Sequence, residues 1–297
     1  MEMNVFEDKT LAATSAYFGP GYDVSLTDVR KLGGLVRRGL VIRKKDEAVA
    51  PTIYLDDFLR MVNEGAAFSD IVNDIVSVAE GARIPEFDPD FFADFEKVRN
   101  RIIMRLVPEG VNRTLLNEVP YFLWNDLAVV FYCQLPETVM EDAGILIRNE
   151  HLKMWDISAD YLSENAGLNM PRISKAVIIP MASILLECGA GQFDPELTEK
   201  CPMYILTNEK RLYGASALVW SDKISELSRS LGKDLFILPS SVHEVILLPD
   251  TGDEDPECLK EMIHEVNMTQ VSPEDRLSDE LYYFDRETGK VEIWGNR

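Results

Sequence analysis

Residues 202–250 have the sequence PMYILTNEKRLYGASALVWSDKISELSRSLGKDLFILPSSVHEVILLPD, and this stretch decides the fold class. Short apolar runs at 204–206, 217–220, 235–238 and 245–248 are rich in β-branched and aromatic residues and are bounded by Asn, Gly, Ser and Pro, which predicts strands. Ser221 and Gly232 delimit one helix between the second and third runs. The order strand, strand, helix, strand, strand predicts an α+β fold with a mixed, largely antiparallel sheet and packed helices.

The composition is that of a globular, acidic protein. Of 297 residues, 46% are hydrophobic, and 51 acidic against 30 basic side chains give a net charge of −21. Such a charge repels phosphate backbones and anionic lipid headgroups, so we expect neither nucleic acid nor a membrane as partner. The first residues, MEMNVFEDKT, have neither a basic start nor an apolar segment, so no signal peptide is expected and the predicted location is cytoplasmic.

Proline-rich residues 83–89 cannot continue a helix and predict a boundary. We expect an N-terminal α+β module over 1–86, a helical connector over 87–118 and a C-terminal α+β domain over 119–297. The expected elements of the module are helices at 3–18, 55–62 and 68–79 and strands at 22–26, 35–42 and 52–55. Apolar spacing predicts a helix over 90–106, a buried strand over 127–135, a capped helix from Asp255 and a final hairpin over 281–294.

The first predicted hairpin carries the main concentration of basic residues in the chain. This stripe is either a docking surface for an anion or acidic partner, or a charged edge that discourages sheet-to-sheet aggregation. Its members are Arg30, Lys31, Arg37, Arg38, Arg43, Lys44 and Lys45.

A weak internal repeat spans two later segments. Residues 145–150 resemble residues 204–209, and in each case a proline follows 31 positions after the shared Asn, with a predicted helix between. The pattern indicates a duplicated strand-helix-strand unit, with chance similarity between short apolar segments as the alternative.

The most suggestive group for chemistry is Pro239-Ser-Ser-Val-His243-Glu244. Ser240 or Ser241 could act as nucleophile and His243 as base, with Glu244 orienting the imidazole ring. The alternative is a structural turn whose serines bond backbone amides, since no Gly-x-Ser-x-Gly elbow is present.

Metal and cofactor motifs are missing from the sequence. Three histidines lie far apart, and Cys133, Cys188, Cys201 and Cys258 form no Cys-x-x-Cys pair, so we expect free thiols and no metal. Gly189-Ala-Gly191 lacks the third glycine of a dinucleotide fingerprint, and we expect no cofactor.

Several segments together resemble a known family. The clearest are 50–55, Asn149-Glu-His-Leu with Trp155, 204–208, 214–217 and above all 236–250. The chain is similar over nearly its whole length to the uncharacterised domain-of-unknown-function family 5688 of gut Clostridia. This resemblance implies a bacterial cytosolic protein and brings no known activity or catalytic residue.

Three functional hypotheses follow. The first is a non-catalytic cytosolic interaction or regulatory protein with an unknown protein partner. The second is a hydrolase that uses Ser240 or Ser241 with His243. The third is an acidic DNA-mimic inhibitor, which requires rows of carboxylates at phosphate-like spacing.

Overall fold

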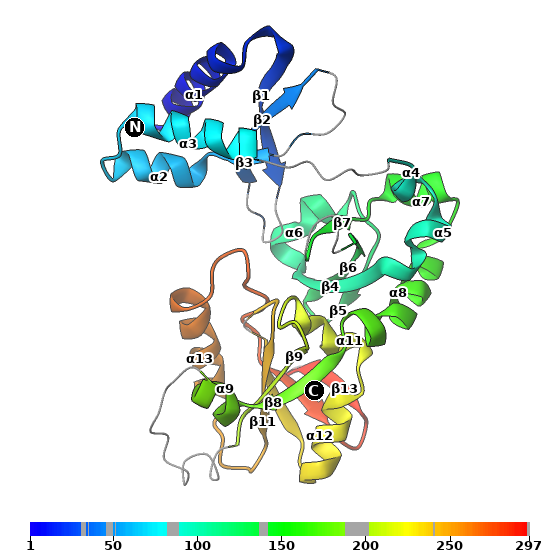
Figure 1. The fold of residues 1–297 in the computed structure, drawn as a ribbon. Coiled ribbons are helices and arrows are strands. Elements are labelled where there is room, and N and C mark those ends of the chain that lie inside the picture. Colours follow the sequence, from blue (N-terminus) through cyan, green and yellow to red (C-terminus); the bar gives the residue numbers. More distant parts are fainter. Residues whose placement is uncertain are drawn as a thin grey trace. The chain divides into compact units, whose positions relative to one another are not determined.

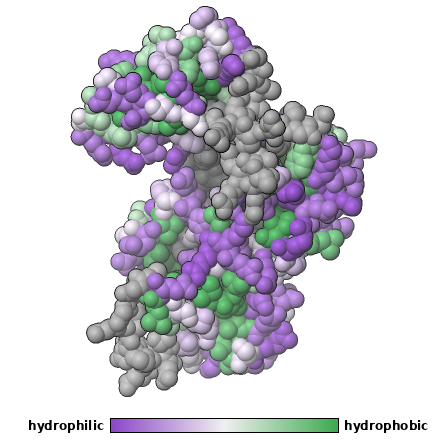
Figure 2. Space-filling model, viewed as in Figure 1, coloured by the Kyte–Doolittle hydropathy of each residue, from purple (hydrophilic) through white to green (hydrophobic). Residues whose placement is uncertain are grey.

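The computed structural model describes residues 1–30, 34, 36–45, 50, 52–81, 89–136, 142–187, 202–239 and 241–295. The chain forms two compact units, Met1–Asp88 and Pro89–Arg297 (Figure 1). Within the described ranges, no helix combines the length and apolar character needed to cross a membrane. The visible faces in Figure 2 are mainly hydrophilic, with hydrophobic residues gathered in smaller patches.

The N-terminal unit is a three-stranded antiparallel sheet covered by three helices. Its elements are α1 (Met3–Phe18), η1 (Gly19–Gly21), β1 (Tyr22–Arg30), β2 (Val36–Lys44), β3 (Thr52–Tyr54), α2 (Asp56–Asn63) and α3 (Phe68–Gly81). Each helix and strand predicted here is confirmed. Apolar side chains from helices and strands share one core, which holds Phe6, Leu40, Ile42, Ile53, Leu55, Ile71 and Ile75.

The C-terminal unit begins with a difference from the predicted helix over 90–106. The helical part is broken into α4 (Pro89–Ala93), α5 (Phe95–Val98) and η2 (Arg99–Arg101), and residues from Ile102 to Pro108 form the strand β4. The helix prediction is wrong for these last residues because six consecutive side chains of β4 are buried, which a strand covered on both faces allows.

β6 (Leu127–Gln134) is the centre of the first sheet in this unit, as its continuous apolar run predicts. β4 pairs with β6 along most of its length. β5 (Tyr121–Trp124) pairs with residues 127–130 of β6, and β7 (Gly144–Leu146) pairs with residues 132–134. All three pairings are antiparallel. The helices α6 (Glu109–Leu116), α7 (Asn149–Trp155) and α8 (Ala159–Ile173) complete this part. Ser158 caps α8 by accepting a hydrogen bond from the Tyr161 N–H.

A second, six-stranded sheet has the order β13-β12-β10-β11-β9-β8, and every neighbouring pair is antiparallel. α13 packs its apolar stripe on one face, against Phe236, Leu248 and Tyr283. Figure 1 shows α12 on the other side of the sheet. The elements are β8 (Ala176–Pro180), α9 (Met181–Glu187), β9 (Tyr204–Asn208), α12 (Lys223–Leu231), β10 (Leu235–Leu238), β11 (Val245–Pro249), α13 (Pro256–Thr269), β12 (Tyr282–Asp285) and β13 (Lys290–Ile293).

Residues 217–220 are helical, so the strand predicted there is wrong. The chain turns through η3 (Gly214–Ser216) into α11 (Ala217–Trp220). Tyr213 has a left-handed backbone with φ 54°, and the Ser216 hydroxyl donates to the Tyr213 carbonyl at 3.0 Å. These local bonds favour a turn over an extended strand.

The α+β class and the antiparallel sheets are confirmed, whereas the duplicated unit is not. β7 pairs in the sheet of β6, and β8 pairs in the six-stranded sheet. β9 and β10 both belong to the six-stranded sheet, with β11 between them. The two segments of similar sequence therefore occupy different structural contexts.

Candidate functional site

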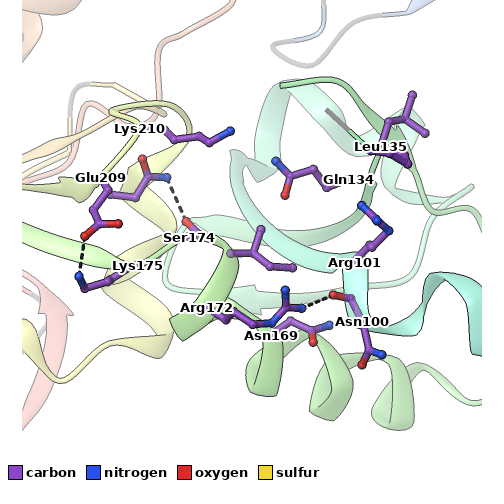
Figure 3. Close-up of a pocket in the computed structure, with 13 residues that line it drawn as sticks. Asn100, Arg101, Gln134, Leu135, Asn169, Arg172, Ser174, Lys175, Glu209 and Lys210 are labelled. Atoms are coloured by element: carbon purple, nitrogen blue, oxygen red, sulfur yellow. Dashed lines mark hydrogen bonds and ion pairs between the residues drawn. The ribbon is translucent and has the colours of Figure 1, made fainter. Parts of the chain in front are cut away.

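A polar cleft of about 950 Å³ lies within the C-terminal unit, where α8, the end of β6 and the end of β9 meet. In Figure 3, Lys175, Glu209 and Lys210 lie on one side and Arg101 and Gln134 on the other, with α8 below them. The lining residues are Asn100, Arg101, Gln134, Leu135, Pro136, Asn169, Arg172, Ile173, Ser174, Lys175, Asn208, Glu209 and Lys210.

Buried amides fix the walls of the cleft. Asn169 on α8 donates to the carbonyls of Arg99 and Ile102 at 2.6 and 3.0 Å, which ties α8 to the start of β4. Asn208 at the end of β9 donates to Ser174 Oγ at 3.0 Å and to the Leu212 carbonyl at 2.8 Å. Because these side chains are buried and bonded, the cleft has a defined shape.

The lining carries more positive than negative charge. Lys175 is paired with Glu209 at 2.5 Å, and Arg172 donates to the Asn100 carbonyl. Arg101 lies over the Phe91 ring at 5.9 Å and has no carboxylate within ion-pair distance in the described ranges. The cleft is therefore electropositive in a chain whose net charge is −21.

A smaller pocket of about 30 Å³ shares five of these lining residues and continues inward to Arg105 and Tyr213. Arg105 lies on β4, and only 7% of it is exposed. Its Nε has no hydrogen-bond partner, and no carboxylate of the described residues lies within ion-pair distance. Buried arginines usually have an acidic partner, so this one requires an explanation.

Two tyrosine rings enclose the Arg105 guanidinium. The guanidinium carbon, Cζ, lies 4.1 Å from the ring centre of Tyr132 and 3.6 Å from the ring centre of Tyr213, and both distances are within cation–π range. Burial lowers the pKa of Arg105, and the neighbouring Tyr132, Tyr213 and Asp142 raise it by smaller amounts. Arginine has so high a pKa that the group stays charged.

The segment that carries Tyr213 is held in an uncommon backbone conformation. Arg211 and Tyr213 both have positive φ, at 52° and 54°. The Tyr213 N–H donates to His243 Nδ1 at 3.1 Å. Gly214 follows, and a Cβ there would lie 2.3 Å from Thr207 Oγ1, so only glycine fits this close approach.

His243 takes part in this support through both ring nitrogens. Nδ1 accepts from Tyr213, so Nε2 carries the proton and donates to Asp275 Oδ1 at 3.2 Å. In this arrangement neither nitrogen is free to accept a proton from a serine. Ser241 Oγ accepts from the His243 N–H at 3.1 Å, as the structural interpretation of this turn expects.

The other residues of the Ser-His turn do not line the two cavities. Ser241, His243 and the half-buried Glu244 lie outside both linings, and Ser240 lies outside the described residues. Asn208 lines both cavities.

Three arginines of the basic hairpin, Arg37, Arg38 and Arg43, are paired with acidic neighbours. Arg38 lies 2.7 Å from Asp28, its partner across β1 and β2, and 3.1 Å from Glu7. Arg43 pairs with the cross-strand Asp23 at 3.2 Å. Arg37 lies 3.9 Å from Asp57, and Lys44 and Lys45 are exposed. Lys31 and the Arg30 side chain lie outside the described residues.

In the part of the chain that the structure describes, no cluster of three or more His, Cys, Asp or Glu side chains could hold a metal ion. Cys133 and Cys258 are free thiols, while Cys188 and Cys201 fall in ranges that are not described. Burial raises the pKa of Cys133 to about 12, so its thiolate is scarce at neutral pH.

Sequence analysis missed Arg105, Arg101 and Arg172 as site residues. The signal for Arg105 was a single charge inside the apolar run Ile102-Ile-Met-Arg-Leu-Val107. A charge in a strand buried on both faces indicates a functional or bonded group. The helix predicted for this segment hid that signal.

No curated protein and no solved structure matches the chain. Residues 3–286 match the family of unknown function DUF5688, and the chain belongs to that family.

Proposed function

We propose that this chain is a non-catalytic binding protein of the bacterial cytoplasm, and that its C-terminal unit holds a small polar anion in the cleft. The observation that carries the proposal is the charge of the lining. Of the four cations in the lining, Lys175 pairs with Glu209 and Lys210 with Asp142, whereas Arg101 and Arg172 have no carboxylate partner among the described residues. Guanidinium groups suit carboxylate and phosphate ligands because they donate two parallel hydrogen bonds.

The size and polarity of the cleft limit the classes of ligand that it could bind. About 950 Å³ accommodates a small molecule, and among the described residues no aromatic side chain lines the cleft to stack on a nucleobase. Asn100 and Gln134 offer amides for hydroxyl groups. A hydroxylated compound with two or more anionic groups fits these features best.

Calorimetry with pyrophosphate and with citrate, at constant ionic strength, tests the proposal. We expect binding by the wild-type chain and about tenfold weaker binding by Arg101→Met and Arg172→Met, because a hydrogen bond to a charged group contributes about 1.5–3 kcal/mol. Arg229→Met is the matched control. Arg229 and Arg172 both lie in the last turn of a helix, and only Arg172 lines the cleft. Equal effects of the two helix variants, or no binding of either probe, would refute the proposal.

A further inference from the structure

Arg105 shows how the cleft would hold one end of its ligand. It is a buried cation on β4 with an unpartnered Nε, and it lines the inner pocket that continues from the cleft. Removing a charge from water without a paired carboxylate is costly, so a fold that needed only packing would favour an apolar residue here. The position is explained if a ligand supplies the missing negative charge.

We propose that Arg105 is the binding residue for a terminal oxyanion, a phosphate or carboxylate group that enters the inner pocket while the rest of the ligand lies in the cleft. The inference rests on the proposed function. The inner pocket, at about 30 Å³, has room for one small group only. Arg101 and Arg172 line the outer cleft and are left for further anionic groups.

The surroundings of Arg105 hold its guanidinium in place before a ligand arrives. Tyr132 and Tyr213 face the group at 4.1 and 3.6 Å and restrict its rotation. A preorganised donor loses little conformational entropy on binding.

Asp142 and Lys210 form an ion pair, at 2.8 Å, at the wall of the inner pocket. The negative charge of Asp142 raises the pKa of Arg105, although the two side chains do not form an ion pair. An incoming oxyanion would face both Lys210 and Arg105. Asp142 would oppose it, which limits affinity and favours release.

Nuclear magnetic resonance of the wild-type chain tests the inference directly. Inorganic phosphate and sodium acetate are titrated separately at constant ionic strength, and the Arg105 Nε–H resonance is followed. We expect this resonance to shift with a saturable dependence on at least one probe, and the stronger probe identifies the phosphate or carboxylate chemistry. The measurement needs no variant and so does not depend on whether a variant folds.

Arg105→Met provides the second readout. We expect a folded chain whose melting temperature is equal or higher without ligand, because a buried charge has been removed. Its affinity for pyrophosphate should fall about tenfold or more. If Arg101→Met and Arg172→Met weaken pyrophosphate binding while Arg105→Met does not and the Nε–H resonance stays fixed, the anion is held in the outer cleft alone and the inference is wrong. If the wild-type chain binds no probe, the proposed function fails as well.

Discussion

The guanidinium carbon of Arg105 lies 3.6 Å from the ring centre of Tyr213, although the two residues are 108 positions apart. Arg105 is in β4 of the first sheet, and Tyr213 lies between β9 of the six-stranded sheet and η3. The contact depends on the left-handed backbone of Tyr213, with φ 54°. His243 holds that conformation by accepting the Tyr213 N–H. His243, which the sequence suggested as a catalytic base, therefore helps to position Tyr213 over the Arg105 guanidinium.

Gly214→Ala should destabilise the C-terminal unit. The new Cβ would lie 2.5 Å from the Asn208 nitrogen and 2.8 Å from the His243 carbonyl oxygen, both of which are backbone atoms. Overpacking of this kind costs about 1–3 kcal/mol, or several degrees in melting temperature. Thermal unfolding followed by circular dichroism measures the change. Gly110→Ala is the control, since a Cβ there meets nothing within 4 Å and the stability should stay the same or rise.

His243→Ala should weaken anion binding without affecting any ester hydrolysis. The substitution removes the acceptor for the Tyr213 N–H and the bond to Asp275, so Tyr213 loses its fixed position over Arg105. We expect about a tenfold loss of pyrophosphate affinity by calorimetry. Asp275→Asn keeps an acceptor oxygen for Nε2 and should retain most of the affinity. Hydrolysis of an activated ester by the wild-type chain that disappears in both Ser241→Ala and His243→Ala would instead support the hydrolase hypothesis.

Asp142→Asn should increase the affinity for phosphate several-fold. The carboxylate lines the inner pocket and opposes an incoming anion, and an amide of the same shape removes that repulsion. Asn tolerates the positive φ of 55° at this position, so the backbone should not change. Calorimetry with inorganic phosphate gives the readout. Glu226→Gln, which breaks the Lys223 pair outside the cleft, should leave the affinity unchanged.

Cys133 should resist alkylation in the folded chain. Its side chain is buried, and burial raises the thiol pKa to about 12, so the reactive thiolate is scarce at pH 7 and gains population only as the pH approaches that value. Peptide mass spectrometry after iodoacetamide treatment should find Cys133 unmodified in native buffer and modified in denaturant. Cys258 is exposed and should be modified in both. Rapid native labelling of Cys133 at pH 7 would contradict the buried position of β6.

The sequence predicted correctly those elements that have a local signal, such as a capping residue or a continuous apolar run. α13 follows from Asp255, which accepts the Glu257 N–H, and from Pro256 in the first turn. β6 follows from an apolar run that only a doubly covered strand would need. β4 was missed because the helical spacing of Phe95 and Val98 in α5 continues to Ile102, the first residue of the strand, and only the pairing with β6 decides between helix and strand.

The site was less predictable than the elements. Arg105, Tyr132 and Tyr213 come from three segments, and no sequence spacing reveals that they meet. The Ser-His turn was conspicuous because its residues are adjacent in sequence. Adjacent residues rarely have catalytic geometry, whereas the contacts of His243 with Tyr213 and Asp275 require the whole fold.

The strand order also has a consequence for biosynthesis. β10 lies between β11 and β12, so one of its edges has no neighbour until residues 282–285 have left the ribosome. Asp275, which bonds His243, emerges in the same late stretch. A nascent chain halted before this point would expose an unpaired strand edge and would lack the support for Tyr213, which makes premature termination a route to aggregation.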